Sequence, residues 1–191
     1  MRTRGFYRSV AAAICVVLLG CLGLPDLSHA ATAADIDASA DQILQLFKEK
    51  HQGGDMALKE AKGVLVFPEI IQAGLVVGGQ YGEGVMRIHG TPVAYYSIGS
   101  GSFGLTAGAS SNALIVLFLQ QGPLDEFRRD ARTDKSWQVG LNGDITVVNV
   151  GASGAISSAQ LNRPIVSFTL DQSGLMANLS LQGAKITRIN R

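Results

Sequence analysis

Apolar residues recur at helical spacing in three parts of the chain. From Ala33 to His51 they repeat every three or four positions, which predicts an amphipathic helix that ends at Gly53-Gly54. A second, short helix is expected from Asp55 to Lys62, with Asp55 as its N-cap. A third is expected from Leu124 to Ala131, after the break at Gly122-Pro123.

Between the second and third helices the pattern is typical of β-strands. Two apolar runs, Val64–Phe67 and Leu75–Val77, are separated by a predicted turn at a proline. Strands at Leu75–Tyr81 and Val85–Ile88 are expected to form a hairpin around Gly82-Glu83-Gly84. His89-Gly90-Thr91-Pro92 is the next predicted turn.

The segment from Val93 to Ser110 alternates large and small residues. Its glycines and serines leave one strand face flat, so another layer or a ligand is expected to lie close against it. The following run, Leu114 to Leu119, is apolar at every position, which predicts a central strand covered on both faces.

The last third of the chain predicts hairpins. Asn142-Gly143 and Asp171–Gly174 are turn signals. Alternation over Val166–Leu170 and Leu175–Gln182 predicts two strands, each with one buried and one wet face, and Ala184–Ile189 is the last strand. We therefore expect an α+β fold: a mostly antiparallel curled sheet, as a half-barrel or a sandwich, with two or three helices packed against it.

The first 30 residues have the pattern of an export signal. A basic start precedes an apolar stretch, Val10–Leu24, that is too short to span a bilayer. We favour cleavage after Ala30, which makes residues 1–30 a signal peptide and residues 31–191 a single domain. The alternative is a lipoprotein signal over residues 1–20, since Leu18-Leu19-Gly20-Cys21 is similar to a lipobox and would leave Cys21 acylated. Both alternatives predict export, to the periplasm or to the outer membrane.

Composition excludes some classes of function. The chain has 16 basic and 15 acidic residues, and loss of the first 30 would remove three Arg and one Asp, leaving 13 and 14. A domain this close to neutral is not expected to bind nucleic acid. The only cysteines, Cys15 and Cys21, lie in the leader, so no disulfide is expected in the mature domain.

Catalytic patterns are missing from the sequence. His51 and His89 fall at a helix end and beside a turn, where we expect them to be exposed. No Gly-x-Ser-x-Gly motif is present, and no two histidines stand at the spacing of metal ligands. We therefore expect no enzyme activity, no cofactor and no metal.

Ala61 to Val85, AKGVLVFPEIIQAGLVVGGQYGEGV, resembles the opening signature of the SYLF domain, a lipid-binding module whose fungal members also bind actin. The match rests on Ala61-Lys62-Gly63, Phe67-Pro68, Ala73-Gly74, Gly78-Gly79 and Gly82 with Gly84-Val85. Weaker similarity extends from about Asp41 to Ala184. Departures occur at Leu105 or Thr106, where the family commonly has Gln, and at Ala177-Asn178, where it has an Ala-Gly pair.

Three segments are candidates for binding. The first is a basic cluster with an aromatic residue that suits an anionic headgroup: Arg128, Arg129, Arg132, Lys135 and Trp137. Four neighbouring carboxylates neutralise much of this positive charge, which favours a simpler interpretation: an ordinary charged helix with the indole against the core. The second comprises lysines of the first two helices, Lys48, Lys50, Lys59 and Lys62, for which a helix docked on the sheet is the simpler reading. The third is the flat face of Tyr95–Ser110, which could hold an acyl chain or a peptide, or simply pack in the fold.

The resemblance implies a function. Eukaryotic SYLF domains bind phosphoinositides through a basic helical segment, and an exported bacterial relative would meet the lipids of the envelope. We therefore expect a non-catalytic protein that binds membrane lipids, most of all anionic ones. The alternative is an envelope scaffold that pairs with a protein partner through its sheet edges.

Overall fold

Three helices and eight strands make up the part of the chain that the computed structural model describes, which is residues 31–74, 77–103, 108–131, 136–148, 155–171 and 179–191. In chain order the elements are α2 (Ala33–Lys50), α3 (Gly54–Glu60), β1 (Gly63–Gly74), β2 (Val77–Ile88), β3 (Thr91–Phe103), β4 (Gly108–Phe118), α4 (Gln121–Asp130), β5 (Trp137–Gln138), β6 (Thr146–Val147), β7 (Ile165–Leu170) and β8 (Lys185–Ile189). The leader, with Cys21 and both alternative cleavage sites, lies outside the described residues.

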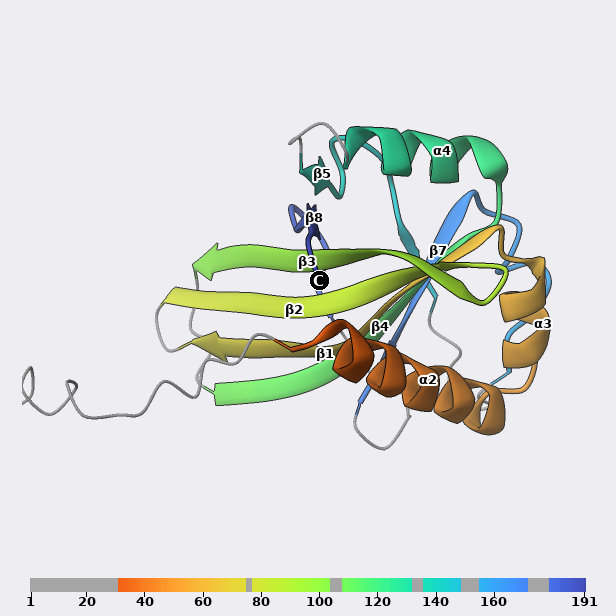
Figure 1. The fold of residues 1–191 in the computed structure, drawn as a ribbon, viewed down its shortest axis with the longest axis horizontal. Coiled ribbons are helices and arrows are strands. Elements are labelled where there is room, and N and C mark those ends of the chain that lie inside the picture. Colours follow the sequence, from red (N-terminus) through yellow and green to blue (C-terminus); the bar gives the residue numbers. More distant parts are fainter. Residues whose placement is uncertain (1–30, 75–76, 104–107, 132–135, 149–154, 172–178) are drawn as a thin grey trace, which may run out of the picture. The chain divides into compact units, whose positions relative to one another are not determined.

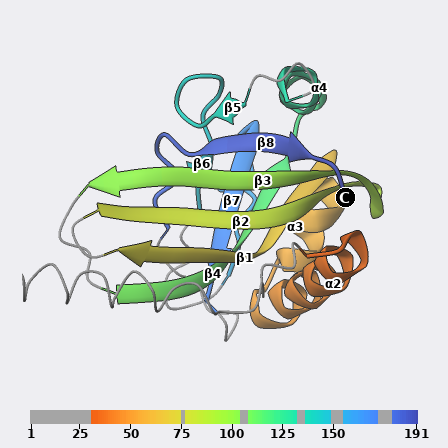
Figure 2. The same ribbon diagram turned by 60° about the vertical axis from the view of Figure 1, so that its left-hand side comes forward.

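All eight strands belong to one curled sheet in the order β5-β8-β3-β2-β1-β4-β7-β6. Every pair is antiparallel except β6 with β7. The order of the first four strands, β3-β2-β1-β4, is that of a Greek key. In Figure 2, β1 to β3 run across the view while β7 runs steeply to them, so the sheet curls as a half-barrel. The predicted α+β class is confirmed, and the half-barrel is the alternative that the structure adopts.

Two apolar clusters cover the two faces of this sheet. Figure 1 shows α2 on one side of the strands and α4 on the other. Leu114, Val116 and Phe118 of β4 point into the α4-side cluster. The alternating residues Ile115 and Leu117 point into the α2-side cluster. The prediction of a central strand covered on both faces is therefore confirmed.

The predicted first helix is confirmed and has a capping box. The Asp35 backbone N–H donates to Thr32 Oγ1 at 3.2 Å, and the Thr32 backbone N–H donates to the Asp35 carboxylate at 3.0 Å. These hydrogen bonds, first that of the Thr32 side chain, hold the pKa of Asp35 below its ordinary value. Ile36, Ala40 and Phe47 form the buried stripe of α2.

The second helix begins earlier than predicted. Its N-cap is Gly53 in a left-handed conformation, with φ +89°, and Asp55 lies inside the first turn. A Cβ on Gly53 would lie 2.7 Å from the Ile156 carbonyl oxygen, so close packing adds to the reason for glycine here. The third helix likewise begins earlier, at Gln121, and includes Gly122-Pro123 in its first turn.

Two predicted turns are instead parts of long strands. β1 runs through Pro68, because a β-bulge between Val66 and Glu69 accommodates the proline. β2 runs through Gly82 and Gly84, where a Cβ would lie 2.5 Å from the Glu69 carbonyl oxygen and 2.2 Å from that of Val66. These glycines therefore mark the close approach of β1, and not a hairpin turn.

The hairpin between β2 and β3 turns where the sequence predicts it. His89 and Gly90 both have positive φ, +49° and +80°. The predicted strand Val93–Ser110, by contrast, falls in two strands that are not neighbours, since β3 ends at Phe103 and β4 begins at Gly108. Residues 104–107, with Leu105 and Thr106, lie outside the described residues.

In the last third of the chain the pairing differs from the prediction. A turn occurs at Asn142, but β5 and β6 on either side of it pair with β8 and β7 and not with each other. β7 is buried at every position, so its expected wet face is wrong; Ser167 and Thr169 lie in the core. The last strand is confirmed as β8. Residues 172–178, which hold most of a predicted turn and the start of the predicted strand Leu175–Gln182, lie outside the described residues. The described end of that prediction, residues 179–182, forms no strand, so this part of it is wrong.

Candidate functional site: a lysine-bearing end formed by two helices

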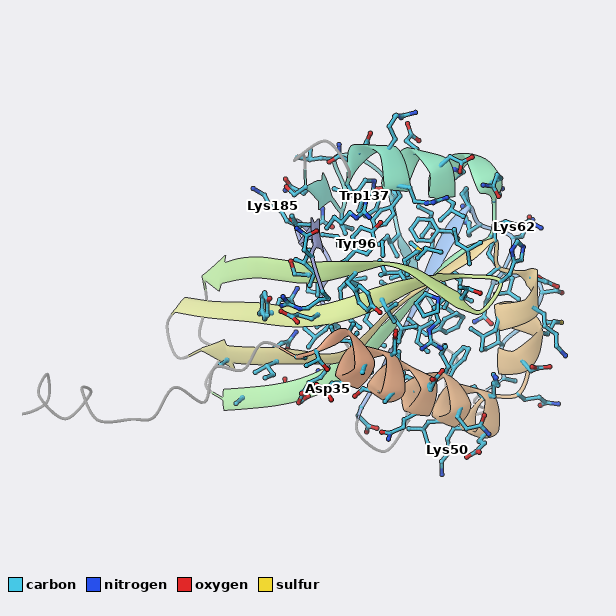
Figure 3. The ribbon with its side chains drawn as sticks, viewed as in Figure 1. Asp35, Lys50, Lys62, Tyr96, Trp137 and Lys185 are labelled. Carbon is cyan, nitrogen blue, oxygen red and sulfur yellow. The ribbon has the colours of Figure 1, made fainter. Side chains whose placement is uncertain are left out.

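The second group of predicted basic residues is carried by the end of α2, the end of α3 and the residues just after it. Lys48 and Lys50 stand in the last turn of α2, Lys59 stands in the last turn of α3, and Lys62 follows two residues after that helix. All four side chains are exposed. In Figure 3, Lys50 lies below the end of α2 and Lys62 lies above α3, so α3 stands between the two labelled side chains. This group is called the lysine end below.

Glycine allows the two helices to meet closely. The Gly54 N–H donates to the His51 carbonyl oxygen at 2.9 Å, directly after the end of α2. A Cβ on Gly54 would lie 2.9 Å from the Phe47 carbonyl oxygen, so a larger residue would push α3 away from α2. The Gly53-Gly54 pair, which the sequence marks only as a helix stop, therefore positions the lysines of both helices.

Asp55 links the lysines electrostatically. Lys59 forms an ion pair with Asp55 one helical turn away. The hydrogen bond from Lys59 holds the pKa of Asp55 below its ordinary value, and the charges of Lys59 and Lys48 act in the same direction. Lys48 on α2 and Lys59 on α3 therefore act on the same carboxylate.

Met56 adds an exposed apolar side chain to this end. It lies on α3 three residues before Lys59 and is 40% exposed, whereas Ala57 next to it is buried. From residue 48 to residue 62, four lysines stand against three carboxylates, Glu49, Asp55 and Glu60, which leaves one net positive charge. An exposed thioether on the same short helix as Lys59 suits the boundary between water and lipid.

The first predicted group, on α4, is less free to bind an anion. Arg129 lies 3.5 Å from Glu126 and 3.5 Å from Asp130. The described part of this helix carries two arginines, Arg128 and Arg129, and three carboxylates, so its net charge is −1. Arg132 and Lys135 lie outside the described residues.

Trp137, which the headgroup hypothesis puts at the surface and the simpler reading puts against the core, lies in the core. Its side chain is 2% exposed and packs edge-on against Phe127, with ring centroids 5.5 Å apart. Figure 3 shows it next to α4. The aromatic part of the predicted headgroup site is therefore corrected, because β5 pairs with β8 and draws the indole inward.

Near the third predicted surface, the strand face of Tyr95–Ser110, two residues of β1 and β2 that the sequence does not single out are apolar and exposed. Ile71 and Tyr81 face each other across β1 and β2 and are 54% and 56% exposed. Gly99 of β3 pairs with Tyr81 and adds no side chain beside it. The Tyr81 hydroxyl donates to Glu83 at 2.7 Å; burial and this hydrogen bond raise the pKa of Tyr81. The one sequence signal for these residues is a tyrosine within a glycine-rich stretch, Gly78 to Gly84.

Buried polar groups hold α2 on the sheet. The Arg87 guanidinium donates to the Asp37 carbonyl oxygen at 3.0 Å and forms an ion pair with Asp41. The Tyr95 hydroxyl donates to the Asp37 carboxylate at 2.9 Å, and burial raises the pKa of Tyr95, as does this hydrogen bond. His51 is also buried, contrary to expectation, because it ends α2 beside Phe47, whose ring lies 5.6 Å away. These residues fix the helix that carries half of the lysine end.

Comparisons with models of known protein families and with curated protein sequences found no match. Within the described ranges, no helix combines the length and the apolar character needed to cross a membrane. No three His, Cys, Asp or Glu side chains among the described residues are grouped so that they could hold a metal ion.

Proposed function

We propose that this chain is an exported, non-catalytic lipid-binding protein of the bacterial envelope, which docks on anionic membrane surfaces through its lysine end. The observation that carries the proposal is that Lys48, Lys50, Lys59 and Lys62 are all exposed on α2, on α3 and just after it, and that Met56 of α3 is exposed as well. The resemblance of residues 61–85 to the SYLF signature points to the same class of ligand.

The expected affinity is modest. A lysine close to an anionic leaflet contributes about 1 kcal/mol, and this contribution falls off within a Debye length, about 8 Å at physiological salt. Four lysines would therefore contribute about 4 kcal/mol, of which the three nearby carboxylates offset a part. Binding should be reversible, should be sensitive to salt, and should require anionic lipid.

Vesicle flotation tests the proposal. The purified protein should float with vesicles that contain phosphatidylglycerol and should stay at the bottom with vesicles of phosphatidylcholine alone. Raising the salt from about 50 to 500 mM, which shortens the screening length severalfold, should release it. Equal flotation on both vesicle types, or none on either, would refute the proposal.

A protein partner is the second candidate, and a part of the β4 edge that is unpaired among the described residues favours it. β4 pairs with β7 only from Ala113 onward, so its backbone from Gly108 to Asn112 has a partner on one side only among the described residues. These five residues carry no charge and no proline, the features that usually block edge pairing. Under this hypothesis a partner adds a strand here. Ser110→Pro should then abolish co-purification of an envelope protein, whereas lipid binding should be unchanged.

A further inference from the structure

A cleft of about 340 Å³ lies between α4 and the two segments at residues 142–146 and 163–165. Its lining includes no residue of the lysine end. Trp137 and Ile165, both buried core residues, form apolar parts of its wall. The volume is at the lower end of the range for small-ligand sites.

The wall of the cleft is held in place before any ligand arrives. Asn142 Oδ1 accepts a hydrogen bond from the Gln138 backbone N–H at 2.9 Å, and the Gly140 N–H donates to the Gly143 carbonyl oxygen at 3.0 Å. A Cβ on Gly143 would lie 2.7 Å from the Trp137 ring, so the loop sits directly on the indole. A preformed site loses little ordering entropy when it binds.

Charges of both signs line this cleft without neutralising one another. Arg163 comes from the segment before β7, Glu126 from α4, and Asp144 from the loop after β5. All three residues are exposed. No ion pair within 4.0 Å joins Arg163 to either carboxylate, and the ion pair of Glu126 among the described side chains is with Arg129, outside the lining. The cleft therefore presents one cation and two anions to whatever enters it.

We propose that this cleft binds a small amphoteric group that carries a phosphate or carboxylate beside a primary ammonium, of the phosphoethanolamine type. The Arg163 guanidinium matches the anionic group, to which it can donate two parallel hydrogen bonds. Glu126 and Asp144 accept hydrogen bonds from the ammonium, and the rings of Pro123 and Pro164 in the lining pack against the carbon atoms between the two charges. This site goes beyond the proposed membrane docking and does not depend on it.

The single tryptophan makes binding directly measurable, because Trp137 lines the cleft. Its fluorescence in the purified protein is followed during titration with phosphoethanolamine, with inorganic phosphate alone and with ethanolamine alone. Phosphoethanolamine should give a saturable change at a concentration at least about tenfold lower than either part, since each charged contact contributes about a factor of ten or more. Equal midpoints for all three, or no saturable change with any of them, would overturn the proposal.

Variants separate this site from general electrostatics. Arg163→Gln and Asp144→Asn should each weaken phosphoethanolamine binding about tenfold or more, whereas Arg188→Gln, on an exposed position of β8, should leave it unchanged. Unchanged binding in Arg163→Gln would overturn the assignment. Far-UV circular dichroism checks that each variant is folded.

Vesicles distinguish a lipid headgroup from a free metabolite. If the source is lipid, phosphatidylethanolamine vesicles should compete with soluble phosphoethanolamine for the Trp137 signal, and phosphatidylcholine vesicles, which lack an N–H donor, should not. If the source is a free molecule, neither vesicle should compete. If a variant of the lysine end no longer floats but still gives the Trp137 titration, the proposed membrane docking fails and the cleft site is supported. If the wild type floats but phosphoethanolamine gives no saturable change in Trp137 fluorescence, the cleft site is refuted and membrane docking is unaffected.

Discussion

Gly84→Ala tests how the glycines of the second strand shape the sheet. The new Cβ would lie 2.2 Å from the Val66 carbonyl oxygen and 2.6 Å from Phe67 Cδ1. An ordinary contact of this kind is about 3.4 Å or more, so β1 would have to move by more than about 1 Å. It has little freedom to do so, because β1 pairs with β2 on one side and with β4 on the other, and Phe67 is fully buried.

The cost follows from overpacking. Extra methylene groups in a packed core cost about 1–3 kcal/mol, and a clash with backbone falls at the upper end of that range. Gly101→Ala is the matched control, since its Cβ would meet nothing within 4 Å and its φ is not positive. It should stabilise the fold by about 0.5 kcal/mol, because alanine restricts the unfolded chain. The two variants should therefore differ by about 3–4 kcal/mol in the free energy of unfolding.

Urea denaturation measures this difference, with far-UV circular dichroism and Trp137 fluorescence as two probes whose midpoints should agree. A Gly84→Ala variant that does not fold, beside a folded Gly101→Ala, agrees with the reasoning. A Gly84→Ala variant within about 1 kcal/mol of the wild type would refute it, because the tight approach of β1 and β2 would then not exist.

Three further predictions concern polar side chains of the fold. Arg87→Met should lower the free energy of unfolding by about 2 kcal/mol, because charge-assisted hydrogen bonds to α2 are lost. Arg188→Met, on the exposed face of β8, should change it by less than about 0.5 kcal/mol. Equal effects of the two variants in urea denaturation would argue against a polar anchor for the helix. Thr169→Val should raise stability by about 1 kcal/mol, since its buried hydroxyl has no hydrogen-bond partner among the described residues, and a loss of stability would contradict this. Burial raises the pKa of Glu83, but hydrogen bonds from Arg191 and from a tyrosine outweigh it and hold this pKa below the ordinary value of 4.5. The stability that the Glu83–Arg191 pair contributes is therefore present above pH 4.5 and is lost as the pH falls below it. In Arg191→Gln the free energy of unfolding should therefore decline less between about pH 5 and pH 3 than in the wild type. An unchanged dependence on pH would show that this pair does not cause the decline.

The periodicity of apolar residues predicted most helices and strands, because each of these elements depends on the spacing of residues close together in the sequence. The stripe that forms α2, the uninterrupted apolar run of β4 and the turn at His89-Gly90 all follow from residues close together in sequence. Strand pairing did not follow in the same way. β5 and β6 flank one turn and pair with different strands, and this depends on contacts between residues far apart in the chain.

The errors at Pro68 and at Gly82-Glu83-Gly84 have one physical origin. Proline and glycine signal a turn locally, yet the same residues serve a bulge and a close strand approach once a neighbour is present. The candidate site shows the same limit. Its lysines could be named from sequence, but the placement of α3 against α2 depends on the Gly53-Gly54 junction, and the burial of Trp137 depends on β8.

Binding of two charge-matched variants to phosphatidylglycerol vesicles tests the central claim most directly. One variant replaces Lys48, Lys50, Lys59 and Lys62 by glutamine, and the other replaces Arg128, Arg129, Arg132 and Lys185, so both lose four positive charges. The partition coefficient of the first should fall by about a hundredfold at low salt, whereas that of the second should stay within a few fold of the wild type. Equal losses would mean that net charge alone drives binding, and a loss confined to the second variant would place the membrane contact on α4 and contradict the lysine end.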